Sequence, residues 1–214
     1  MTDTMTATTA TILDLEGPAA LHLLDAIRAA AIVRSRDTYR PAICGVLLDV
    51  TPDDGVRVVA TDSYRLMTAT VRDAFADPVQ FVIPGDMVPA LAKIVTVAQS
   101  RKMSAGEQVR VIVTLDNHDI VATVTVGGTT TCTAGRDDGL TFPTYRALTP
   151  EHTCEHGAYN PAYLADLGKL AQAGAFDPTT PVVTVSTHPS KPGIWTITDD
   201  RLAITYVLMP MRVL

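Results

Sequence analysis

The 214-residue chain has few of the residues that mark membrane and secreted proteins. No apolar run approaches the about 20 residues that a membrane helix needs. Its three cysteines, Cys44, Cys132 and Cys154, are odd in number and widely spaced, which disfavours a disulfide framework. Residues 1–8 are polar, unlike the charged and then apolar start of a signal peptide, and are expected to form a disordered lead-in. We therefore expect a cytoplasmic protein.

Aromatic side chains and positive charges are also scarce. Aromatic residues make up 5% of the chain, so stacking on single-stranded nucleic acid is not favoured. The 17 cationic residues, of which 13 are Arg and 4 are Lys, are outnumbered by 23 acidic residues, giving a net charge of −6. Domains that bind nucleic acid are usually basic. Net charge does not tell where the charges lie, so a local nucleic-acid-binding surface stays possible.

Motifs of enzymes are absent as well. The sequence has no phosphate-binding loop, nucleophile elbow or catalytic triad signature. Its most enzyme-like feature is the H-x-C-x-H run of His152, Cys154 and His156. On a strand these side chains share one face about 6.6–6.8 Å apart, so a zinc ion with bonds of about 2.1–2.3 Å could bridge neighbours but hardly all three. We interpret the run as a polar strand start and expect no metal, no cofactor and no enzymatic activity.

One order of elements is predicted three times along the chain, which is typical of internal repeats. Period-2 alternation predicts strands and apolar spacing predicts helices. The first block has a strand over 10–15, a helix from Gly17-Pro18 to Val33, and strands over 42–50, 56–62 and 66–71. The second has a strand over 79–83, a helix over 87–98, and strands over 109–115, 120–126 and 129–134. The third begins near Cys154, with a helix from Asn160-Pro161 to Gly174 and strands over 182–186, 194–198 and 202–209.

The predicted fold class is therefore α+β, with three consecutive βαβββ repeats and antiparallel sheets. A single repeat leaves the edges of its sheet unpaired, and identical repeats can pair those edges. Because three is an odd number, one edge stays unpaired unless another chain covers it. We therefore predict that the chain associates.

Four segments, in order, resemble the signatures of bacterial DNA sliding clamps, the β subunit of DNA polymerase III. Taken alone, each segment is weak, and an ATDxxR sequence is most often simply a turn. Together with the repeats they cover nearly the whole chain. The segments are Val59–Leu66 (VATDSYRL), Phe81–Pro84 (FVIP), Gly139–Arg146 (GLTFPTYR) closing at Pro150, and Tyr206–Arg212 (YVLMPMR).

The resemblance implies a DNA-clamp fold, with antiparallel sheets outside and helices lining one face. Residues 9–148 resemble the complete middle clamp domain, and residues 149–214 resemble the second half of the last domain. Clamp rings hold twelve repeats, so three repeats per chain would close a ring as a homotetramer joined head to tail. The implied function is a non-enzymatic processivity factor that encircles duplex DNA.

The resemblance also implies a pocket for short partner peptides. Three positions depart from the family pattern: Ser63 stands where Gly is most frequent, Ala147 where a basic residue is frequent, and Val213 is an extra residue. Methionines suit a surface that accepts several sequences, and Arg65 and Arg212 would face acidic flanks of a peptide. The implied pocket residues are Ile43, Thr61, Ser63, Tyr64, Arg65, Leu66, Pro143, Leu148, Val207, Met209, Pro210, Met211 and Arg212.

The helices of a clamp face the hole, and weak contacts to phosphates suffice for sliding without sequence preference. The cations implied to face DNA are Arg28, Arg34, Lys93, Arg101, Lys102 and Lys169. They could equally be ordinary solvated helix charges. The expected partners are double-stranded DNA, and a replicative polymerase and clamp loader bound through short linear peptides. Two alternatives stay open: a clamp-like peptide-binding adaptor or decoy that encircles nothing, and a small metal-dependent hydrolase.

Overall fold

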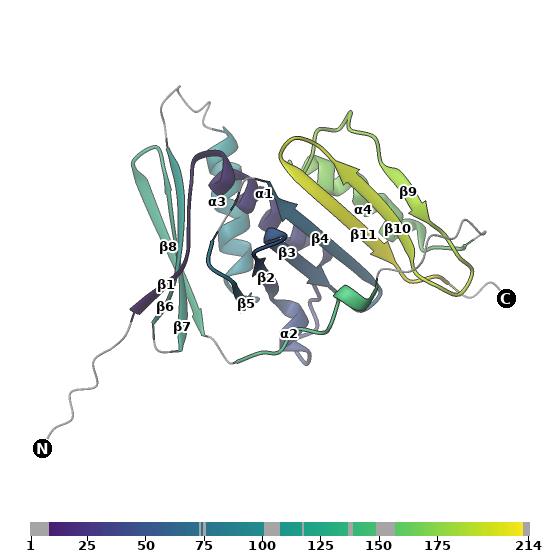
Figure 1. The fold of residues 1–214 in the computed structure, drawn as a ribbon, viewed down its shortest axis with the longest axis horizontal. Helices are drawn as coiled ribbons and strands as arrows, with labels where there is room; N and C mark the ends of the chain where they lie inside the picture. Colours follow the sequence, from purple (N-terminus) through teal and green to yellow (C-terminus); the bar gives the residue numbers. More distant parts are fainter. Residues whose placement is uncertain are drawn as a thin grey trace, which may run out of the picture.

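The computed structural model describes residues 9–72, 74, 76–100, 108–116, 118–136, 139–148 and 157–211. In these residues a helix followed by three strands occurs three times along the chain (Figure 1). The elements are β1 (Thr9–Glu16), α1 (Gly17–Val33), α2 (Pro41–Cys44), β2 (Val46–Thr51), β3 (Gly55–Thr61), β4 (Arg65–Val71), β5 (Val79–Ile83), α3 (Val88–Ser100), β6 (Val109–Asp116), β7 (Asp119–Val126), β8 (Thr129–Arg136), a 3₁₀ turn (Arg146–Leu148), α4 (Pro161–Gln172), β9 (Val183–Ser186), β10 (Gly193–Thr198) and β11 (Leu202–Leu208).

The strands form two antiparallel sheets. One has the order β1-β6-β7-β8, and the other has the order β5-β2-β3-β4-β11-β10-β9. The strand that precedes each of the first two helices is exchanged between blocks, because β1 pairs with β6 and β5 pairs with β2. The first two blocks are therefore interlocked and share one core. The α+β class and the antiparallel sheets are confirmed.

The third block joins the first through strand edges. β11 lies antiparallel to β4, from Leu202 opposite Val71 to Leu208 opposite Arg65, without interruption. This edge-to-edge pairing turns two separate sheets into the seven-stranded sheet. The expectation that repeats extend a sheet by pairing their edges is confirmed for this junction.

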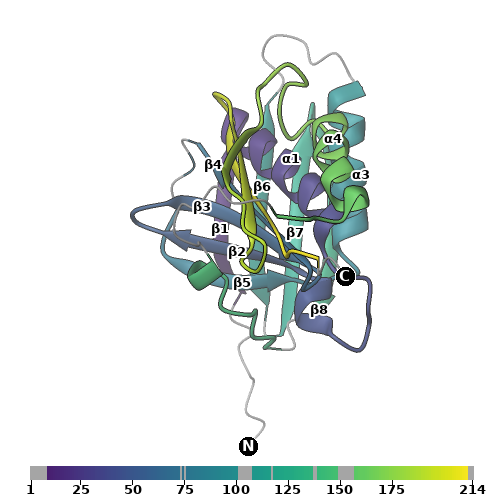
Figure 2. The same cartoon turned by 90° about the vertical axis from the view of Figure 1, so that its right-hand side faces the viewer.

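The three long helices α1, α3 and α4 gather on one side of the seven-stranded sheet (Figure 2). α1 packs against α3, α4 and both sheets, and Leu24 and Ile27 on it are buried. Pro18 stands in the first turn of α1, where its missing N–H costs no hydrogen bond. Asn160 caps α4 by accepting a hydrogen bond from the Ala162 N–H at 2.9 Å, as its sequence predicts.

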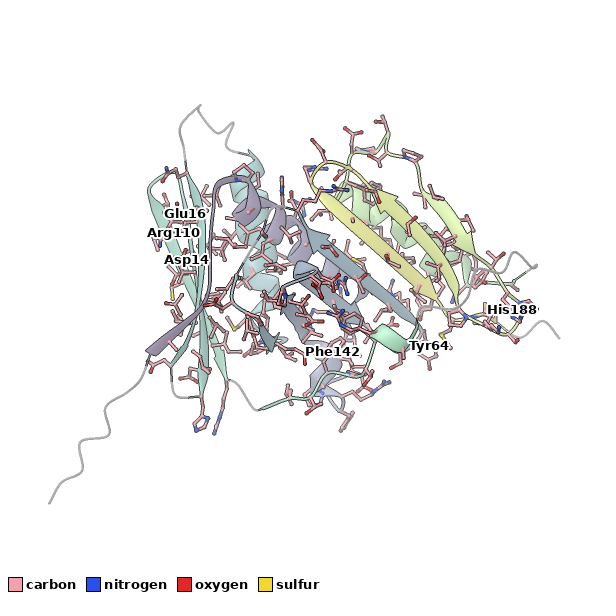
Figure 3. All side chains as sticks on the ribbon, viewed as in Figure 1. Asp14, Glu16, Tyr64, Arg110, Phe142 and His188 are labelled. Carbon is pink, nitrogen blue, oxygen red and sulfur yellow. The ribbon has the colours of Figure 1, made fainter. Side chains whose placement is uncertain are left out.

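A second apolar cluster lies on the opposite face of the same sheet. Leu47, Val59, Leu66, Val207 and Tyr145 are buried in it together with Val82 and Ile194. Leu140 and Phe142 pack against this cluster, so the segment 139–148 crosses the outer face of the sheet (Figure 3). Leu66 and Val207 therefore lie on the face of the sheet away from the three long helices α1, α3 and α4.

The predicted strand over 42–50 is wrong at its beginning. Residues 41–44 form the short helix α2, and the strand starts only at Val46. Pro41 fixes the backbone angle of the first helical position, which an apolar run such as Ala42-Ile43-Cys44 does not reveal. The strand expected near Cys154 lies outside the described residues. No helix among the described residues is both long and apolar enough to cross a membrane.

Candidate partner-binding site

The segment between β3 and β4 is a sharp corner held by its own side chains. One carboxylate oxygen of Asp62 accepts hydrogen bonds from the N–H groups of Tyr64 and Arg65, both at 3.0 Å. The Thr61 hydroxyl accepts from the Ser63 N–H at 3.1 Å and donates to the Arg65 carbonyl at 2.7 Å. Ser63 has a φ of 81°, in the left-handed region. The corner leaves the Tyr64 side chain 62% exposed.

The end of β11 lies beside this corner. The Met209 N–H donates to the Tyr64 carbonyl at 2.9 Å, which extends the β4–β11 pairing by one step. Met209 and Met211 are 46% and 50% exposed. Large apolar side chains at this level of exposure are candidates for contact with a partner. Figure 3 shows Tyr64 at the end of β4 that meets the end of β11.

Two hollows share Leu66 and Val207 as common lining residues, and we call them together the paired hollow. The smaller hollow is about 30 Å³ and lies at the corner. The larger is about 220 Å³ and lies beside the segment 139–148. The smaller is lined by Thr61, Ser63, Tyr64, Arg65, Leu66, Pro192, Val207 and Met209. The larger is lined by Arg57, Leu66, Thr68, Tyr145, Arg146, Thr205 and Val207.

A charged cluster fixes the wall of the larger hollow. The Tyr145 hydroxyl donates to the buried Asp49 carboxylate, and Arg146 donates to the same oxygen at 2.7 Å. Arg146 also donates to Asp54 at 2.9 Å, and Asp54 pairs with Arg57 at 2.8 Å. Burial, with the hydrogen bond to Asp49, raises the pKa of Tyr145, and the hydrogen bond from Arg146 lowers the pKa of Asp54. The segment 139–148 is thereby held against β2 and the turn that follows it.

Arg65 lies at the paired hollow, but its guanidinium group faces inward. It donates to Asp62 at 2.9 Å and to the Ile32 carbonyl of α1 at 3.0 Å. It also forms an ion pair with Asp166 of α4 and lies 4.7 Å above the ring of Tyr163. The sequence suggested that the Arg65 guanidinium would face the acidic flank of a peptide. In the structure it is instead paired with these groups of the chain itself. Arg65 instead links the first and third blocks.

The structure gathers part of the implied pocket and separates the rest. Thr61, Ser63, Tyr64, Arg65, Leu66, Val207 and Met209 line the smaller hollow. Ile43 is buried in α2, and Pro143 is exposed; neither lines the paired hollow. Pro210 and Met211 follow β11 without lining it. Arg212 and the side chain of Leu148 lie outside the described residues.

Sequence reasoning missed several residues of this site, among them Asp49, Tyr145 and Arg146. Tyr145 and Arg146 belong to the quoted GLTFPTYR segment, yet only Pro143 of that segment was assigned to the pocket. Asp49 interrupts the otherwise apolar run Val46-Leu47-Leu48-Asp49-Val50, and a lone carboxylate in a buried strand needs a partner. That interruption was the available signal. No comparable sequence signal marked the other lining residues, Arg57, Thr68, Pro192 and Thr205.

The cations implied to face DNA differ in their surroundings. Lys93 on α3 and Lys169 on α4 are exposed, and Lys169 pairs with Asp166 at 2.5 Å. Arg28 donates to the Gln172 carbonyl at 3.1 Å, which links α1 to α4. Arg34 is half-buried and donates to the Cys44 carbonyl at 2.6 Å, and burial lowers its pKa. Arg101 and Lys102 lie outside the described residues.

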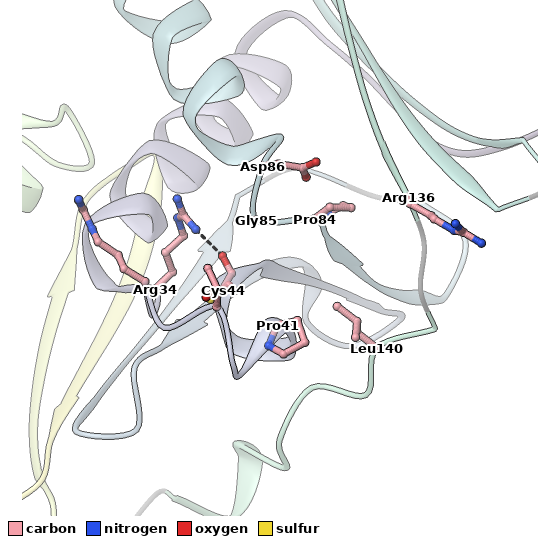
Figure 4. A pocket seen from close by; sticks show the side chains of 10 residues that line it. Arg34, Pro41, Cys44, Pro84, Gly85, Asp86, Arg136 and Leu140 are labelled. Carbon is pink, nitrogen blue, oxygen red and sulfur yellow. Dashed lines mark hydrogen bonds between the residues drawn. The ribbon is translucent and has the colours of Figure 1, made fainter.

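A larger hollow of about 480 Å³ lies apart from the paired hollow and shares no lining residue with it (Figure 4). Arg34, Arg36 and Arg136 line it together with Asp86. Among the described residues, no group of three or more His, Cys, Asp or Glu side chains is placed to hold a metal ion. His152, Cys154 and His156 lie outside the described residues.

Comparison with known proteins assigns the family. Residues 20–131 match the family described as the DNA polymerase III beta subunit, central domain. The chain belongs to this family. The match covers α1 to β8 almost completely, and it includes the corner at Ser63 and the buried Asp49. No curated protein matches the chain.

Solved structures of this family share the fold. A DNA polymerase sliding clamp from Pseudomonas aeruginosa, solved with a ligand, superposes with a TM-score of 0.68 at 18% identity, over 100% of this chain and 70% of that one. The DNA polymerase III beta subunit of Thermotoga maritima gives 0.69 at 13% identity, over 99% and 69%. A sliding clamp from Bartonella birtlesii bound to griselimycin gives 0.67 at 19% identity, over 99% and 68%. The clamp fold therefore extends through all three blocks of the chain.

Proposed function

We propose that the chain is a non-enzymatic DNA sliding clamp that encircles duplex DNA as a homotetrameric ring and tethers a replicative polymerase. Residues 9–148 would supply a full clamp domain, and residues 149–214 half of one. Family membership supports the class of function. The observation that carries it for this chain is the third block, which continues the sheet of the first and leaves α1 and α4 in contact on the same side.

Partners would bind in the paired hollow. Its floor of Leu66 and Val207 is apolar, and the exposed side chains of Tyr64 and Met209 line its smaller part. A short peptide with two or three apolar anchors suits such a surface, because a few buried side chains supply most of the binding energy. Polymerase and clamp loader would compete for this one site. The sliding clamp from Bartonella birtlesii is a family member solved with a bound ligand, griselimycin.

The duplex would lie on the helical side of the ring. Lys93 and Lys169 are exposed there, and four copies of each would face the phosphates without reading sequence. Because Lys169 pairs with Asp166, its attraction to phosphate is weakened, which agrees with sliding rather than tight binding. The net charge of −6 is compatible with this interpretation, since the acidic side chains Asp53, Asp54 and Asp119 lie on turns and strand ends.

The first arm of the test addresses the ring, both its encirclement of DNA and its number of chains. The protein is cross-linked into its oligomer on nicked circular DNA, and its retention is compared before and after linearisation. A ring is expected to stay on the circle and to be lost from the linear molecule, and light scattering is expected to give four chains. A concentration-independent monomer would rule out the ring.

The second arm tests the peptide site. The double variant Met209→Ala, Met211→Ala is expected to weaken binding of a fluorescent polymerase peptide at least tenfold while the oligomeric mass is unchanged. The variant Val183→Ala, which also removes an exposed apolar side chain, is the matched control and should bind the peptide normally. Peptide binding without retention on circular DNA would favour the adaptor that encircles nothing.

A further inference from the structure

Strand β8 forms one end of the four-stranded sheet. It pairs with β7 from Thr129 opposite Val126 to Arg136 opposite Asp119 without a bulge, and within the described residues no strand pairs with its other side. Thr129 and Val126 flank the two-residue turn Gly127-Gly128, both glycines having positive φ. In such a hairpin the hydrogen bonds alternate along the strand. Every second residue of β8, including Cys132 and Ala134, therefore turns its N–H and C=O toward the open side.

Nothing in β8 protects this open edge. Exposed edge strands are normally shielded by proline, lysine, a bulge or short length. β8 has eight residues, TTTCTAGR, with no proline and no lysine, and its only charge is at the last residue, Arg136. A regular edge of this length, with a charge only at its last residue, is a template for another strand.

The chain itself shows which kind of strand such an edge accepts. β4, β8 and β11 are each the third strand after a long helix, namely α1, α3 and α4. β4 and β11 pair with each other, antiparallel and edge to edge. Among the described third strands only β8 lacks such a partner. In a second copy of the chain the third strand left open is again β8.

We propose that β8 pairs antiparallel with β8 of a second copy, across a two-fold axis. The pairing continues the four-stranded sheets of two chains into one sheet. It places the two Arg136 side chains at opposite ends of the shared ladder, whereas a parallel pairing would set them side by side. This contact rests on the proposed ring and names one of its interfaces. It differs from the head-to-tail contact expected from the sequence, which would join β8 to a different surface.

Cys132 lies in the middle of β8 and is exposed, so it reports on this contact. In an antiparallel β8 pair the two Cys132 residues lie opposite each other or within about 14 Å along the strands. In a head-to-tail ring they lie on different interfaces. The test uses the variant Cys44→Ser, Cys154→Ser, in which Cys132 is the single cysteine, and a bismaleimide of about that reach. Serine at position 44 can still donate to the Asp37 carbonyl that the Cys44 thiol contacts.

The expected result is nearly complete cross-linking into dimers, and none larger, at low protein concentration. The matched control carries its only cysteine on an exposed turn of the first block, Asp53→Cys with all three native cysteines replaced by serine, and should stay uncross-linked. A tetramer by light scattering whose Cys132 does not cross-link would overturn the β8 contact and leave the ring standing. Efficient Cys132 cross-linking without retention on circular DNA would establish the β8 contact and contradict the proposed function.

Discussion

At the scale of single residues, the corner at Ser63 combines strain with a place in the proposed partner site. A non-glycine residue at a φ of 81° is strained by contact of its Cβ with the backbone. The Ser63 hydroxyl in turn contacts a guanidinium nitrogen of Arg40. Ser63 also lines the smaller hollow, so its strain lies directly where a partner would bind.

We predict that Ser63→Gly raises the free energy of unfolding by about 1 kcal/mol, because glycine adopts this φ without strain. Urea unfolding measured by circular dichroism checks the prediction. Ser63→Ala is the control, since it removes the hydroxyl that contacts Arg40 and keeps the Cβ. If Ser63→Gly were less stable than Ser63→Ala, strain would not be the dominant effect at this corner.

The sequence could identify a residue of the site only where the partners of that residue are close to it in the sequence. Asp62, Tyr64 and Ser63 act within a few positions of one another, so a turn with exposed polar groups was predictable. Two partners of Arg65, Asp166 and Tyr163, lie about a hundred positions away, and nothing in a local pattern reveals them. The same distance hid the contact between Tyr145 and Asp49. Ion pairs and hydrogen bonds between residues far apart in the sequence were therefore the part of the site that could not be predicted.

At the scale of elements, the junction between α1 and the β10–β11 hairpin contains a buried carboxyl. Asp25 on α1 is 2% exposed, and a guanidinium nitrogen of Arg201 lies 3.8 Å from its carboxylate. Burial raises the pKa of Asp25 to about 7, and the charge of Arg201 offsets this only in part. Asp25 therefore takes up a proton more readily in the folded chain than in the unfolded chain.

This raised pKa predicts a pH dependence of stability. The folded state binds more protons than the unfolded state between about pH 4 and pH 7, so the free energy of unfolding falls as the pH rises through that range. We predict that Asp25→Asn removes this decline. The free energy of unfolding of the variant should therefore rise relative to that of the wild type between pH 5 and pH 8. Thermal unfolding at several pH values measures it. Asp53→Asn, an exposed carboxyl on a turn, is the control for the loss of one charge, and equal pH profiles of wild type and Asp25→Asn would contradict the prediction.

The elements themselves were mostly predictable, and their exchange between sheets was not. Period-2 alternation located the described strands of the three blocks, apart from the start of β2, and Pro18 and Asn160 marked the starts of α1 and α4. The pairing of β1 with β6 and of β5 with β2 could not be inferred, because an alternating strand shows which face is buried but not which sheet it joins. α2 was missed because its four residues are too few to show a helical period.

At the scale of the whole molecule, the proposed pairing of β8 with β8 of a second copy limits how a ring can close. Two chains joined through β8 form a unit of six repeats with the third block of each chain at its two ends. Both ends are identical, so a ring can close only through a second two-fold contact between third blocks. Four chains then supply the twelve repeats of a clamp through two kinds of interface. A head-to-tail ring of four chains would use one kind of interface four times.

The two arrangements respond differently when β8 is blocked. Ala134→Pro removes an N–H that points to the open side of β8, and an edge position tolerates proline within one chain. We predict that this variant forms dimers held by the remaining contact between third blocks, as measured by light scattering over a range of concentrations. Ala134→Ser keeps the N–H and should stay a tetramer. In a head-to-tail ring that uses the β8 edge, the same proline would break the one interface on which every neighbour depends, and the variant would be a monomer.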